Sequence, residues 1–135
     1  MDRLRFLLDT NIVSHLVRYP QGIVKERIAQ VGEESVCVSL VVAAELRFGA
    51  AKKKSTRLTQ QVDAILSALQ ILPLEAPVDV HYAEIRVALE TAGCPIGAND
   101  LIIAAHARAL GLTLVTHNID ELSRVPGLHI ENWLS

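Results

Sequence analysis

The sequence predicts an α/β domain of three layers, with helices on both faces of a mostly parallel central sheet of four to five strands. Two observations support this fold class. Short apolar runs alternate along the chain with longer stretches of helical spacing, which is the pattern of strand–helix–strand units. The chain has 135 residues, half of them apolar, which is enough for one core. We therefore expect a single domain over residues 1–135.

The first half of the chain predicts strands that alternate with helices. An apolar run at 4–8 ends abruptly at Asp9, Thr10 and Asn11, and helical spacing follows directly. Ser39 stands where an N-cap is needed before the next long helix. We expect further strands at 36–38 and 71–74, and helices at 12–17, 23–31, 40–51 and 58–69.

The second half predicts two helices, a strand and a short closing segment. Asp79 is the expected cap of a helix that Gly93 stops, and Asn99 is the expected N-cap of an apolar helix at 101–110. Strands are expected at 112–115 and, after the Pro126-Gly127 turn, at 128–130. Trp133 is expected to close the core or an interface rather than to stack on a base.

Composition excludes several classes of protein. No apolar run approaches the ~20 residues of a membrane span. Cys37 and Cys94 have no Cys-x-x-Cys spacing and no signal peptide precedes them, so we expect reduced thiols and a cytoplasmic protein. The net charge of −2 argues against a non-specific nucleic-acid binder. Motifs of serine hydrolases, zinc peptidases and nucleotide-binding loops are absent from the sequence.

Three carboxylates stand where an apolar environment is expected. Asp100 falls in the first turn of an apolar helix, where it either stabilises the helix start or holds a metal ion. Glu45 lies within an apolar stripe, so it pairs with a base such as Arg5 or Arg47, reaches the rim, or serves a site. Asp9 either caps the helix that follows it or stands in a ligand-binding crevice.

The predicted topology allows these acids to meet. The ends of the first and fourth strands lie at one edge of a parallel sheet, which brings Asp9, Glu45, Asp100 and the segment 118–121 within reach of one another. Clustered carboxylates repel unless a divalent cation neutralises them, and oxygen ligands favour Mg²⁺ or Mn²⁺ over zinc. An aspartyl phosphatase also begins with a strand-end aspartate, but it needs a second acid where this chain has Asn11.

A dense basic cluster follows Glu45 in the sequence. It can be the solvated end of a helix, or it can bind phosphates beside the site. Both interpretations stay open for its members, which are Arg47, Lys52, Lys53, Lys54 and Arg57.

Four segments together resemble a known family. They occur in the same order and spacing as the signatures of PIN-domain ribonucleases, and most resemble the VapC-type toxins of bacterial toxin–antitoxin pairs. The likeness runs nearly from end to end. The segments are Leu7-Leu8-Asp9-Thr10-Asn11, Ser39 with Ala44-Glu45-Leu46, Pro95-Ile96-Gly97 with Asn99-Asp100, and Val115-Thr116-His117-Asn118.

The resemblance implies a Mg²⁺-dependent endoribonuclease that cleaves RNA and is inhibited by a cognate VapB-like antitoxin. It also implies a homodimer, and contact with DNA only through the antitoxin. Under the resemblance Asp9 and Asp100 match the metal-binding aspartates, and Glu45 matches the acid that orients water or a second ion. The open alternative is a protein-binding module of the same fold with little or no catalytic activity.

The resemblance also assigns supporting roles. Thr10 and Thr116 match side chains that support the site. Asn118 matches a fourth catalytic position, where many relatives have aspartate, and this departure leaves the second metal site open. Glu121 or Asp120 is the expected substitute.

Overall fold

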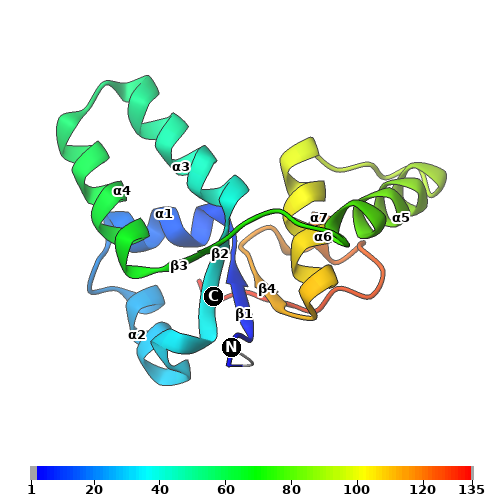
Figure 1. The fold of residues 1–135 in the computed structure, drawn as a ribbon, viewed down its shortest axis with the longest axis horizontal. Helices are drawn as coiled ribbons and strands as arrows, with labels where there is room; N and C mark the ends of the chain where they lie inside the picture. The colour runs from blue at the N-terminus through cyan, green and yellow to red at the C-terminus, as the bar shows by residue number, and fades with distance from the viewer. Residues whose placement is uncertain (1–2, 135) are drawn as a thin grey trace.

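The computed structural model describes residues 3–134 and has a five-stranded central sheet (Figure 1). The strands lie in the order β3-β2-β1-β4-β5, and every neighbouring pair is parallel. The α/β fold class and the parallel sheet are therefore confirmed. The strands are β1 (Phe6–Leu8), β2 (Val36–Ser39), β3 (Gln70–Leu72), β4 (Thr113–Val115) and β5 (Ile130–Glu131).

Helices cover the sheet on both sides. Figure 1 shows α3 and α4 as a long hairpin on one side of the strands, with α1 beside them, and α5 and α6 together on the other side. The helices are α1 (Thr10–Arg18), α2 (Ile23–Val31), α3 (Leu40–Lys53), α4 (Thr56–Ala68), α5 (Val78–Thr91), α6 (Ala98–Leu110) and α7 (Ile119–Leu122), with a 3-10 turn at Glu33–Ser35.

Several predicted strand limits are wrong by a few residues, because backbone pairing rather than apolar character ends a strand. β3 stops at Leu72, since Pro73 has no N–H to continue the ladder. The final strand begins at Ile130 instead of 128, because the Leu128 N–H donates to the Val125 carbonyl in a turn. The first strand begins at Phe6 instead of 4.

Two predicted helix caps are also wrong. The N-cap of α6 is Gly97, whose carbonyl accepts from the Leu101 N–H at 3.0 Å, so Asn99 lies inside the first turn with its side chain free for another contact. The N-cap of α5 is Pro77, which leaves Asp79 in the first turn. The Ser39 cap is confirmed, because its hydroxyl accepts from the Val41 N–H.

The core lies between the sheet and the two helical layers. Trp133 is buried and packs edge-on against Phe6, with ring centroids 5.3 Å apart, so its expected place in the core is confirmed. Cys37 and Cys94 form no disulfide, as expected. Within residues 3–134, every helix is too short or too polar to cross a membrane.

Candidate functional site

Asp9 lies at the carboxyl end of β1, where the chain turns into α1. Its side chain is buried, and it caps α1 by accepting from the Thr10 N–H at 2.7 Å through Oδ1. Its other oxygen, Oδ2, accepts from the Thr116 hydroxyl at 2.7 Å. Thr116 directly follows β4, the neighbour of β1, so the parallel sheet brings these two residues together. Asp9 is thus both a helix cap and a buried acid at the sheet edge.

Glu45 projects from α3 toward the starts of α1 and α6. One carboxylate oxygen, Oε1, accepts a short hydrogen bond from the Thr10 hydroxyl, and Oε2 accepts from Asn99 Nδ2 at 2.9 Å. The bases weighed from the sequence are engaged elsewhere. Arg47 pairs with Asp63 on α4, and the Arg5 guanidinium donates to the Val31 carbonyl. Two neutral donors from two other elements therefore position the Glu45 carboxylate.

Asp100 stands in the first turn of α6 and interacts electrostatically with the other acids. Partial burial raises the pKa of Asp100 to about 6, and the negative charges of Asp9, Glu121 and Glu45 add to this effect. Burial also raises the pKa of Asp9, and the charge of Glu45 raises it further, whereas the bonds from Thr116 and Thr10 partly offset the rise. The structure thus brings four acids, one that follows β1 and three from α3, α6 and α7, close enough to repel one another.

The residues that follow β4 make different contributions to this site. The Asn118 N–H donates to the Thr116 hydroxyl at 3.0 Å, so the backbone of Asn118 helps to fix the group that holds Asp9. The Asn118 side chain forms no capping bond at the start of α7. Glu121 is partly buried, and its negative charge raises the pKa of Asp100, whereas Asp120 is exposed. Of the two substitutes expected from the sequence, the structure places Glu121 nearer to the acids.

The acids fit a hydrated divalent cation better than a closed metal cage. Among residues 3–134, no three His, Cys, Asp or Glu side chains are gathered as a metal cage. Ion pairs in this range leave out Asp9, Glu45, Asp100 and Glu121, so their mutual repulsion is not relieved by a basic side chain. Mg²⁺ commonly keeps several waters and takes one or two carboxylates from the protein. The donor set therefore suits Mg²⁺ or Mn²⁺.

Asn99 is the site residue that sequence reasoning missed. Its position next to Asp100 was a signal, but the residue type also suits a helix cap, and the cap explained it fully. The contact with Glu45 joins positions 54 residues apart, which no local pattern indicates.

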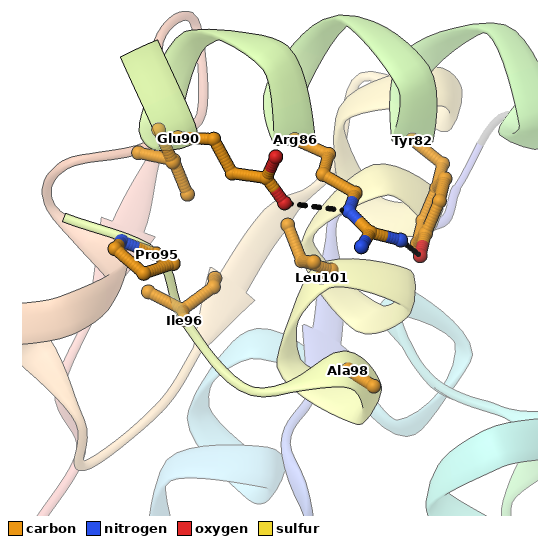
Figure 2. Close-up of a pocket in the computed structure, with 8 residues that line it drawn as sticks. Tyr82, Arg86, Glu90, Pro95, Ile96, Ala98 and Leu101 are labelled. Carbon is orange, nitrogen blue, oxygen red and sulfur yellow. Dashed lines mark hydrogen bonds and ion pairs between the residues drawn. The ribbon is translucent and has the colours of Figure 1, made fainter. Parts of the chain in front are cut away.

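A cavity on the far side of α6 is separate from the acids. Figure 2 shows it between α5 and the start of α6, with Leu101 and Ile96 on one wall. Arg86 crosses its edge and donates to Glu90 at 2.8 Å and to the Tyr82 hydroxyl at 3.0 Å. The cavity has about 280 Å³, and none of the acids described above lines it. The candidate active site is therefore the group of four acids beside the carboxyl ends of β1 and β4.

Comparison with known proteins agrees with this geometry. The family model described as PIN domain matches residues 6–128, a range that contains all four acids. The chain belongs to the PIN-domain family. This confirms the resemblance seen in the sequence.

Relatives of this PIN domain are ribonucleases. It is 38% identical over 130 residues to "Ribonuclease VapC2" of Rickettsia felis, covering 95% of this chain and 97% of that protein. It is 34% identical over 131 residues to "tRNA(fMet)-specific endonuclease VapC" of Salmonella typhimurium, covering 96% and 98%.

A solved structure shares the whole fold of this PIN domain. VapBC2 from Rickettsia felis, solved with a DNA fragment from its promoter, superposes with a TM-score of 0.90. The sequence identity is 36%, and the match covers 96% of this chain and 99% of the other. The PIN domain described here is therefore of the VapC type.

Proposed function

We propose that this PIN-domain protein is a divalent-metal-dependent endoribonuclease and the toxin of a toxin–antitoxin pair. The observation that carries the proposal is the set of four acids at one sheet edge, which have no basic partner within residues 3–134. This arrangement occurs in a chain that is similar over nearly its whole length to VapC ribonucleases.

Dependence on a divalent metal is general among PIN-domain nucleases, and we assign Mg²⁺ here, with Mn²⁺ as a substitute. Asp9 and Asp100 would hold the ion, and Glu45 and Glu121 are the candidates for a second position. When bound, such an ion makes water more acidic and offsets the charge of a phosphate.

Neighbouring side chains and backbone groups orient the two carboxylates that act in the reaction. Thr116 and the Thr10 N–H fix the two oxygens of Asp9, so this carboxylate has one orientation. Thr10 and Asn99 hold Glu45, whose carboxylate accepts the proton of the attacking water. The water oxygen bonds to phosphorus while the bond to the 3′-oxygen breaks. The departing 3′-oxygen takes a proton from solvent water, which leaves a 5′-phosphate and a 3′-hydroxyl. Thr10 and Thr116 are thus supporting residues, and a catalytic role of Asn118 stays a prediction.

The partners follow from the same assignment. The substrate is RNA, and the inhibitor is a cognate VapB-like antitoxin. Contact with DNA would come through the antitoxin, and the solved Rickettsia felis complex includes a DNA fragment from its promoter. Self-association into a dimer and a cytoplasmic location stay predictions.

RNA cleavage by the purified chain tests the proposal. We expect Mg²⁺-dependent cleavage with 5′-phosphate ends, loss of cleavage in EDTA, and loss in Asp100→Asn with the fold intact by circular dichroism. Asp63→Asn is the matched control, because Asp63 is an acid of a remote surface ion pair. A protein-binding module without activity would give no cleavage under any of these conditions, and full activity of Asp100→Asn would refute the site.

A further inference from the structure

A groove of about 280 Å³ opens beside the acidic site, between α1, α3 and α4. Figure 1 shows these three helices next to one another on one side of the sheet. Two of the residues that line the groove are Thr10 and Glu45, which are bonded to each other. The groove therefore begins at the proposed active site.

Two rows of residues form the walls of this groove. Thr10, Ser14 and Arg18 recur every fourth residue along α1, which places them on one face of the helix. On α3 the matching row is Glu45, Gly49 and Lys53, with the same spacing. Each row starts at a site residue and ends, about 12 Å further along its helix, at a cation.

The two cations are available to a ligand. Arg18 and Lys53 are exposed, and neither forms an ion pair with an acid of the described residues. Lys53 is also the one member of the basic cluster that lines the groove. Arg47 is paired with Asp63, and the Lys52 ammonium lies over the Phe48 ring at 6.0 Å.

The middle of the groove is open. A Cβ atom placed on Gly49 would meet no atom outside the helix backbone within 4 Å. Apolar side chains of α3 and α4 form the floor, among them Leu46, Leu58 and Val62. This shape leaves room for a chain that runs from Glu45 toward Lys53.

We propose that this groove holds the RNA strand on one side of the cleaved bond, with Arg18 and Lys53 binding a backbone phosphate. The inference rests on the proposed ribonuclease function. Four acids at the site repel a polyanion. A cation bound among them would offset this repulsion only for the phosphate at the site. A neighbouring phosphate needs its own positive charges, which the far end of the groove supplies. The apolar floor contacts the sugar and base faces between the two phosphates.

RNA affinity in an inactive background tests the cations. A fluorescein-labelled unstructured RNA oligonucleotide is titrated into Asp100→Asn at several KCl concentrations, followed by anisotropy. Adding Arg18→Gln and Lys53→Gln is expected to weaken binding about 10- to 100-fold and to reduce the salt slope by about 0.7, because one phosphate contact is lost. The matched control, Lys52→Gln with Arg57→Gln, also removes two positive charges, but from residues outside the groove. It is expected to change affinity about 2-fold at most.

Gly49 provides an independent test that fills the groove without removing charge. Gly49→Ala and Gly49→Leu should both keep or raise the melting temperature, because glycine is a poor helix former and the site is open. Only Gly49→Leu should weaken RNA binding, about 10-fold, since its side chain extends into the groove.

The outcomes separate this inference from the proposed function. If the charge variant and Gly49→Leu both bind RNA as tightly as their controls, the RNA assignment is overturned and the groove is left to a protein segment such as the antitoxin. Wild-type cleavage, measured in parallel, is the test of the ribonuclease function itself. Cleavage by the wild type, together with unchanged RNA binding in these inactive variants, would overturn the groove assignment alone.

Discussion

Asn99 and Glu45 are joined by a hydrogen bond of 2.9 Å between Nδ2 and Oε2, which ties the first turn of α6 to the middle of α3. The Thr10 hydroxyl holds the other oxygen of the same carboxylate. The proposed proton acceptor is thus oriented by side chains from two further helices, and its position depends on residues that hold no metal themselves.

Asn99→Ala should therefore lower RNA cleavage about 10- to 100-fold, because it removes one hydrogen bond to a charged group worth about 1.5 to 3 kcal/mol. The measurement is a double-mutant cycle with Glu45→Gln, using initial cleavage rates. If Asn99 acts through Glu45, its loss has little further effect once Glu45 is replaced. Equal effects of Asn99→Ala in both backgrounds would contradict the positioning role.

The raised pKa of Asp100 predicts a pH-dependent stability of the metal-free protein. Its folded pKa of about 6 lies above the ordinary value of 3.8, so the folded state binds more protons between these values. The contribution of Asp100 is thus most favourable below about pH 4 and is lost as the pH rises through about 6.

Thermal unfolding in EDTA between about pH 5 and 7.5 measures this effect. We expect Asp100→Asn to stabilise the metal-free protein by about 1 kcal/mol at pH 7.5, a value discounted for solvent screening because Asp100 is partly exposed. The gain should shrink toward pH 5. A gain that does not change with pH would show that repulsion at Asp100 is not its source.

Divalent cations should reverse the repulsion among the acids. A cation present at 100 times its dissociation constant stabilises the folded state by about 2.7 kcal/mol. Mg²⁺ or Mn²⁺ is therefore expected to raise the melting temperature of the wild type by several degrees, and Asp9→Asn and Asp100→Asn should abolish most of the rise. An equal rise in these variants would place the ion elsewhere on the chain.

Thr116 links the end of β4 to Asp9 through a buried hydroxyl that also accepts from the Asn118 N–H. Thr116→Val keeps the shape but removes the donor and the acceptor, so we expect a loss of about 1 to 3 kcal/mol in the free energy of unfolding. Cleavage should fall as well, because Asp9 loses one of its two fixed contacts. Thr116→Ser keeps the hydroxyl and should restore most of both properties in urea-unfolding and cleavage assays.

The predictability of the site from the sequence differs between its parts. The proximity of Asp9 and Thr116 could be predicted, because each directly follows an apolar run and a parallel sheet brings the ends of neighbouring strands to one edge. Asp100 and Glu45 were marked by being charged within apolar helices. The predicted sheet topology indicated that these acids lie close together, and the family resemblance specified their roles.

Other features depended on contacts that no local pattern contains. From the sequence, Asn99 could equally cap a helix or donate a hydrogen bond to a distant acceptor. In the structure α6 begins at Gly97 without a side-chain cap. Arg47 was an open partner for Glu45, but its contact with Asp63 follows from how α3 packs on α4. The groove that ends at Arg18 and Lys53 likewise depends on the mutual packing of three helices.

Crystals soaked in Mn²⁺ show which carboxylates hold the metal, because anomalous scattering locates the ion without any assumption about activity. We expect a peak within bonding distance of carboxylate oxygens of both Asp9 and Asp100, about 2.0 to 2.3 Å, and its loss in crystals of Asp100→Asn. A well-occupied peak elsewhere with neither aspartate as a ligand, or no peak at saturating Mn²⁺, would contradict it.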